Sequence, residues 1–68
     1  MKTFGEILKN LRIERGLTQV QLANILCLDK STIAKYETDR IEPSVSMIKE
    51  LAKFFQVTTD YLLGLTEL

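Results

Sequence analysis

The chain has no histidine and only one cysteine, Cys27, among its 68 residues. One cysteine cannot form an internal disulfide, and without histidine the usual zinc-binding sets of side chains cannot be assembled. Three glycines also leave the chain without a glycine-rich phosphate-binding loop. These absences argue against an enzyme, a metal site and a bound cofactor. No binding site for a small molecule is evident in so short a chain.

Long apolar runs are missing as well. None approaches the roughly 20 residues of a membrane-spanning helix, and none resembles the apolar core of a signal peptide. One proline and no low-complexity stretch leave nothing that would act as a linker between domains. We therefore expect residues 1–68 to form a single small domain, and the unpaired cysteine suits the reducing cytoplasm.

What the chain does have is a pattern of helix caps and apolar residues, clearest between residues 18 and 40. Thr18 is followed three residues later by Gln21, which is the spacing of a capping box at a helix start. Apolar residues then recur at helical spacing as far as Leu26, and Asp29 offers a second cap soon afterwards. Two short helices joined by a tight turn are the pattern of a helix-turn-helix.

The second of these helices, expected over residues 30–38, has two unlike faces. At about 100° per residue, Ile33 and Tyr36 fall on one side. The other side carries small, polar or basic residues, namely Lys30, Ser31, Ala34, Lys35 and Thr38. Such a helix can enter the major groove of duplex DNA, where lysine and serine bond to base edges and alanine touches thymine methyl groups. A solvated face would explain two lysines alone, but the short, doubly capped turn favours double-stranded DNA as the partner.

The remaining segments are predicted to form scaffold helices, so the fold class is all-α. Thr3 and Glu6 form a capping box for the first helix. Ser44 begins the fourth helix, and Thr58 begins a short last helix over residues 59–63. The residues of the fourth helix that we expect to face the core are Val45, Ile48, Leu51, Ala52 and Phe55.

In its whole register the chain resembles the lambda-repressor-like helix-turn-helix proteins, also called the Cro/C1 or XRE type. The segments that carry the resemblance extend over nearly all of it: TQVQLANIL, LDKSTIAKYE, EPSVSMIKELAKFFQV and TTDYLLG. The resemblance implies a compact domain of five helices, in which the second and third form the DNA-binding unit of a transcriptional regulator.

The resemblance also implies roles for single residues. Those that match base-reading positions are Lys30, Ser31 and Lys35. Those that match positions near the DNA backbone are Gln19, Thr38 and Arg40. Arg12 and Glu37 match a pair that often forms a partly buried ion pair between the first and third helices, and we assign this pair to the scaffold.

Two residues depart from the family pattern. Cys27 stands in the turn where many relatives have glycine, often with positive φ, and Asp39 replaces a frequent glycine after the third helix. A residue other than glycine with positive φ is uncommon and mildly strained. The charge of Asp39 is also expected near the phosphates that Thr38 and Arg40 would contact.

The charge balance gives DNA binding less support, because nine basic and nine acidic residues cancel, whereas nucleic-acid-binding domains are usually basic. Residues 1–40 carry seven basic and five acidic residues, and residues 41–68 carry two and four. We expect weak non-specific binding by a monomer. The alternative is a small helical protein-interaction module whose DNA binding is incidental.

Apolar residues beyond the needs of the core suggest a homodimer. The candidate interface consists of Met47 and Phe54, expected near the surface of the fourth helix, and the tail residues Leu63, Leu65 and Leu68. Incomplete covering of the core would explain them equally well. A two-fold dimer would bind a palindrome with half-sites about 10 bp apart. Over a promoter it would most simply repress, although activation fits the sequence equally well.

Overall fold

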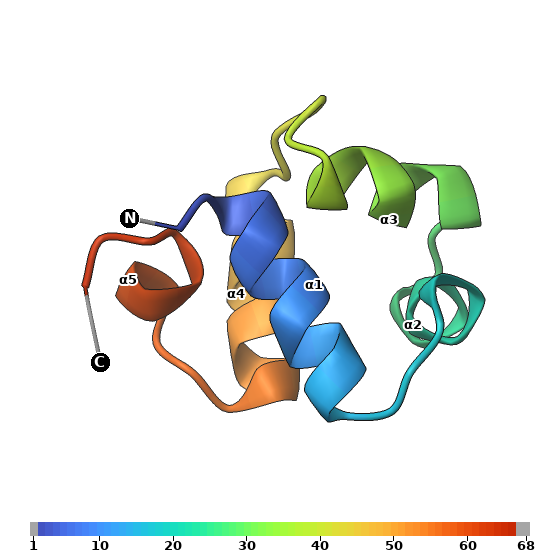
Figure 1. Cartoon of the computed structure of the whole chain (residues 1–68), viewed down its shortest axis with the longest axis horizontal. Coiled ribbons are helices and arrows are strands. Elements are labelled where there is room, and N and C mark those ends of the chain that lie inside the picture. The colour runs from blue at the N-terminus through green and yellow to red at the C-terminus, as the bar shows by residue number, and fades with distance from the viewer. Residues whose placement is uncertain (1, 67–68) are drawn as a thin grey trace.

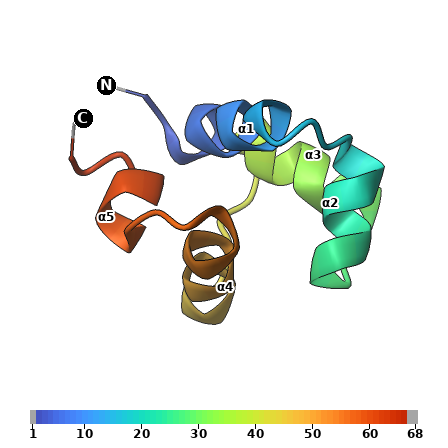
Figure 2. The ribbon, with the colours of Figure 1, turned by 90° about the horizontal axis from the view of Figure 1, so that it is seen from below.

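The computed structural model describes residues 2–66, which form five helices and no strand. The helices are α1 (Phe4–Glu14), α2 (Gln19–Leu26), α3 (Lys30–Glu37), α4 (Val45–Phe55) and α5 (Thr59–Leu62). In the two perpendicular views of Figures 1 and 2, α1 crosses the middle of the molecule, α2 and α3 lie at one end, and α5 lies at the other. The predicted all-α, five-helix fold is confirmed. Within residues 2–66, no helix has the length and apolar character needed to cross a membrane.

Hydroxyl side chains set the starts of four helices. Thr3 and Thr18 each accept a hydrogen bond from the backbone N–H three residues on, and the side chain at that third position bonds back to the N–H of the cap. Both predicted capping boxes are therefore present. Ser44 and Thr58 cap α4 and α5 with their hydroxyls. Asp29 occupies the N-cap position of α3, as predicted, but its side chain makes no capping hydrogen bond.

A left-handed residue follows the end of each of the five helices. The three that are not glycine are Cys27, Asp39 and Gln56, with φ of 58°, 59° and 57°. The positive φ expected at the turn is thus present at Cys27. α3 ends at Glu37 and α5 at Leu62, each one residue earlier than predicted, which is within the ordinary uncertainty of helix ends.

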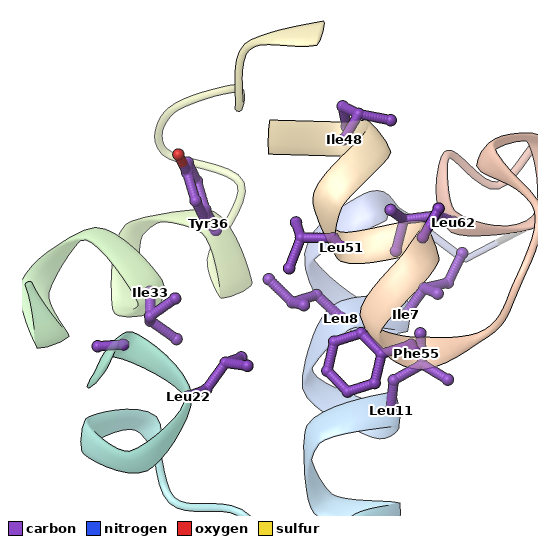
Figure 3. Close-up of a cluster of buried hydrophobic side chains, with 12 residues drawn as sticks. Ile7, Leu8, Leu11, Leu22, Ile33, Tyr36, Ile48, Leu51, Phe55 and Leu62 are labelled. Carbon is purple, nitrogen blue, oxygen red and sulfur yellow. The ribbon is translucent and has the colours of Figure 1, made fainter. Parts of the chain in front are cut away.

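The core takes one completely covered side chain from every helix. These five residues are Leu8, Leu22, Ile33, Leu51 and Leu62. Figure 3 shows them among the other buried side chains, with Leu22 and Ile33 packed between α2 and α3, and with Leu8, Leu51 and Leu62 among α1, α4 and α5. Because the buried cluster is continuous, α2 and α3 are packed against the scaffold rather than joined to it only by the chain.

The sequence prediction for α4 was wrong at Val45, and two partly buried residues lie closer to the core than expected. Val45, expected to face the core, is 72% exposed, whereas Met47 and Phe54, expected near the surface, pack against the core. At about 100° per residue, Val45 and Phe54 lie on opposite flanks of the stripe that contains Leu51. The helix is rotated so that the Phe54 flank faces the molecule. There the Phe54 ring lies edge-on to Phe55, with the ring centroids 4.9 Å apart.

α1 and α3 approach each other closely at Gly5. A Cβ atom at this position would lie 2.6 Å from the carbonyl oxygen of Glu37 and 2.7 Å from that of Tyr36. Any larger residue would therefore push the end of α3 away from α1, so the absence of a side chain at Gly5 fixes where α3 sits.

Candidate nucleic-acid interface

The turn between α2 and α3 holds the two helices in a fixed relation. Cys27 adopts the left-handed conformation, and the N–H of Leu28 then donates to the carbonyl oxygen of Ala23 at 2.8 Å. Ala23 and Ile33 are buried where the helices pack. α2 therefore supports the inner side of α3 and leaves its outer side open.

The outer side of α3 carries the residues that the sequence assigned to base contacts. Lys30, Ser31 and Lys35 are all exposed, while Ile33 and Tyr36 are buried on the opposite side. The only acidic residue of α3 is Glu37, which is also buried. The exposed surface of this helix therefore includes two ammonium groups and no carboxylate.

Glu37 lies at the centre of a hydrogen-bonded cluster that joins three helices. Nε of Arg12 donates to Oε2 of Glu37 at 2.6 Å, and Nη2 of Arg12 donates to Oε1 at 3.1 Å. Nε2 of Gln19, at the start of α2, donates to the same Oε1 at 3.1 Å. Nη1 of Arg12 donates to the carbonyl oxygen of Leu17 at 2.8 Å. The ion pair predicted between Arg12 and Glu37 is thus present, and Glu37 is only 8% exposed.

Gln19 is held by this cluster, which the sequence did not predict. A side-chain amide has two N–H donors, and the contact with Glu37 occupies one of them. The other remains for a further acceptor. The sequence predicted Gln19 only as a DNA contact, because the approach of Glu37 depends on how α3 packs against α2.

Asp39 has a role that the sequence analysis missed. Its Oδ2 accepts a hydrogen bond of 2.7 Å from the hydroxyl of Thr3, and its Oδ1 accepts one of 2.9 Å from the backbone N–H of Gly5. The carboxylate therefore caps the start of α1, where the partial positive charge of the helix stabilises it. It is turned toward α1, and the expected conflict with the phosphate contacts of Thr38 and Arg40 is reduced.

An open hollow of about 430 Å³ lies at the C-terminal end of α3 and is lined by Ala34, Lys35, Thr38 and Arg40. The hydroxyl of Thr38 donates back to the carbonyl oxygen of Ala34 at 2.9 Å and lies 3.4 Å from that of Lys35. Its single hydrogen is therefore directed into the helix. Thr38 and Arg40 are both exposed, next to the outer side of α3.

The residues proposed for a dimer interface do not share one exposed surface. Met47 and Phe54 pack against the core, Leu63 and Leu65 are exposed, and Leu68 lies outside the described residues. Leu63 instead lines a groove of about 470 Å³ together with Ile41 and Val45, which the sequence analysis did not assign to the dimer interface. We call this surface the Ile41–Val45–Leu63 groove.

Within residues 2–66, acidic and cysteine side chains do not gather into a group of three that could hold a metal ion. In the same part of the chain, every buried side-chain nitrogen or oxygen has a hydrogen-bond partner. The polar side chains available to bond to a partner in this part of the chain are therefore those on the surface.

A family model described as "Helix-turn-helix" matches residues 8–62 of the chain. Among curated proteins, the HTH-type transcriptional activator BcrR of Enterococcus faecalis is 42% identical over 65 residues, which are 96% of this chain and 32% of that protein. The immunity repressor protein of Bacillus phage phi105 is 39% identical over 62 residues, which are 91% of this chain and 43% of that protein. The chain thus spans between about a third and a half of the length of these relatives.

Among solved structures, a transcriptional regulator from Listeria innocua superposes with a TM-score of 0.88 at 30% sequence identity. The match covers 97% of this chain and 62% of that one. The similarity therefore includes all five helices and extends beyond the two that form the motif.

Proposed function

The chain belongs to the helix-turn-helix family of the Cro/C1 or XRE type, and from this membership we propose that it is a sequence-specific DNA-binding transcriptional regulator. The observation that carries the proposal is the outer side of α3, which exposes Lys30, Ser31 and Lys35 and no carboxylate. The same membership supports a role in DNA binding and not in catalysis, since the relatives are named as transcriptional regulators. A regulator of this kind would work in the cytoplasm, where bacterial DNA lies.

In the proposed complex, α3 enters the major groove and Lys30, Ser31 and Lys35 contact base edges. Lysine donates to O6 and N7 of guanine, and serine can donate or accept. Gln19 and Arg40 contact the phosphates, Gln19 through the amide N–H that Glu37 leaves free. Thr38 is less suited to a phosphate, because its hydroxyl hydrogen is directed at Ala34 and phosphate oxygens only accept hydrogen bonds.

We further propose that two copies bind DNA together and meet at the Ile41–Val45–Leu63 groove. Ile41, Val45 and Leu63 are exposed apolar side chains, 41%, 72% and 40% exposed, and they line one surface. Asp39 lines the groove, and its neighbour Arg40 lines the hollow next to α3. A second copy seated there would bring its own DNA-binding side next to the first, as a palindromic operator requires.

The direction of regulation depends on where the operator lies. Bound over a promoter, the protein would exclude polymerase and repress. The relatives include one protein named as an activator and another named as a repressor. We propose repression as the simplest mechanism, because it requires no contact with polymerase.

The test is selection of bound duplexes from a randomised DNA pool at moderate salt, followed by sequencing. An inverted repeat with half-sites about one helical turn apart would support both DNA binding and the dimer. A single half-site would support DNA binding and contradict stable dimerisation. If no sequence were enriched at any salt concentration, the regulator proposal would be wrong and a protein-interaction module would be favoured.

A further inference from the structure

We propose that the hollow lined by Ala34, Lys35, Thr38 and Arg40 binds the 5-methyl group of a thymine in the operator. Ala34 and Thr38 would then be specificity-determining residues. The inference rests on the proposed DNA-binding function and adds to it which base the protein distinguishes, and with which atoms.

The first support is the chemistry of the hollow. Two of its four lining side chains are short, and Ala34 offers only a methyl group. Thr38 directs its hydroxyl at the carbonyl oxygens of Ala34 and Lys35, at 2.9 and 3.4 Å. With the hydroxyl engaged there, the methyl group is the part of Thr38 available for an apolar contact in the hollow that this residue lines. Two methyl groups side by side form an apolar contact surface within an otherwise polar DNA-binding side.

The second support is the position of these two residues. Ala34 and Thr38 are four residues apart, so they are neighbours along one face of the helix. Lys35 and Arg40 form the other walls of the hollow, and the backbone N–H of Arg40 is fixed by a 2.9 Å hydrogen bond to the carbonyl oxygen of Lys35. The apolar surface thus lies between a lysine suited to a base edge and an arginine suited to a phosphate.

The third support is the mismatch between this surface and polar base edges. The thymine 5-methyl group is the apolar feature that a base presents in the major groove. A cytosine at the same place has only a hydrogen at C5, so the apolar surface of the hollow would lose its apolar partner. The hollow would therefore favour thymine over cytosine.

The experiment is a methyl scan of the operator obtained from the randomised pool. Each thymine is replaced in turn by deoxyuridine, which pairs identically and lacks only the methyl group. We expect one position in each half-site at which affinity falls about fourfold, corresponding to about 0.8 kcal/mol for one buried carbon group. Replacing the other thymines should change the affinity less.

Thr38→Ser identifies the residue responsible, because serine keeps the hydroxyl bond to the helix and loses only the methyl group. At the sensitive position, this variant should distinguish thymine from deoxyuridine clearly less than the original protein does, because only the methyl group of Ala34 remains. Thr59→Ser is the matched control, since Thr59 is exposed on α5, at the other end of the molecule from α2 and α3 (Figure 1). The Thr59→Ser variant should distinguish thymine from deoxyuridine as strongly as the original protein does.

Three results would overturn the inference while leaving DNA binding intact. They are an operator without thymine, an operator in which no thymine methyl group affects affinity, and a sensitive position at which Thr38→Ser discriminates as well as the original protein. Failure of the proposed function differs from these, since it appears earlier, as the absence of any enriched sequence.

Discussion

Lys35 is exposed on the outer side of α3, and the one acidic residue of that helix is buried on the opposite side. Lys35→Ala should weaken specific DNA binding by about 1–3 kcal/mol, because the proposed contact of Lys35 with a base is lost. The free energy of unfolding should change by less than about 0.5 kcal/mol, as is usual for surface residues. Titration of a labelled operator, with thermal melting of the free protein, measures both.

The matched control for Lys35 is Lys49→Ala, which removes an exposed lysine of α4, outside the helix-turn-helix. It should leave operator affinity nearly unchanged. Equal losses from both variants would mean that Lys35 acts only through general charge. If Lys35→Ala lost no operator affinity, Lys35 would not be a base contact.

Glu37 contributes to stability through its partners. Glu37→Ala leaves the guanidinium of Arg12, whose side chain is only 11% exposed, without its carboxylate. Breaking a buried ion pair by removing one partner costs about 3–5 kcal/mol, so the urea midpoint should fall strongly. Glu50→Ala, at an exposed position of α4, should leave it almost unchanged. A midpoint for Glu37→Ala equal to that of the original protein would show that the pair contributes little in solution.

Single residues differ in how far the sequence predicts them. The pairing of Arg12 with Glu37 followed from resemblance to a known family. The roles of Asp39 and Gln19 did not, because their partners lie 34 and 18 residues away and are brought near only by packing. The direction of the Thr38 hydroxyl depends on its rotamer, which a sequence pattern does not encode.

At the scale of the helices, two aspartates differ from the capping roles that the sequence suggests. Asp29 stands at the N-cap of α3 without a capping bond, whereas Asp39 caps α1 from the far end of α3. Asp39→Ala should cost about 2 kcal/mol, from the lost cap and from placing alanine in a left-handed conformation. Asp29→Ala should cost less than half as much. Thermal melts of both variants give the ranking, and a larger loss at Asp29 would contradict the observed capping.

The starts of the helices were predictable because capping depends on residues three positions apart. The rotation of α4 was not. Its apolar residues span more of the helix circumference than one core can cover, so periodicity leaves the choice between Val45 and Phe54 open. Packing decides it, since Phe54 meets Phe55 and lies 5.5 Å below the Arg15 guanidinium, and Val45 has no such neighbours.

At the scale of the whole molecule, the dimer proposed at the Ile41–Val45–Leu63 groove predicts how association can be broken without unfolding the monomer. Val45→Asp should raise the dimer dissociation constant at least tenfold, or about 1.4 kcal/mol, because a charge would be buried without a partner. The monomer should stay folded, since Val45 is exposed and an acidic residue is favourable in the first turn of a helix. Sedimentation equilibrium measures the association.

Ile13→Asp is the control for this prediction, because Ile13 is an exposed apolar residue of α1 that does not line the groove. It should leave the dimer intact. A Val45→Asp protein that dimerised as strongly as the original would place the interface elsewhere, and equal weakening by both variants would indicate non-specific association.

The cluster around Glu37 has a consequence for the thermodynamics of recognition. One carboxylate accepts hydrogen bonds from α1 and α2 while belonging to α3, so these helices are already fixed relative to one another in the free protein. Ordering mobile segments is a large part of the entropic cost of association. A preorganised domain avoids that cost, and its discrimination between operators then depends on surface complementarity and on how readily the duplex deforms to meet a rigid partner.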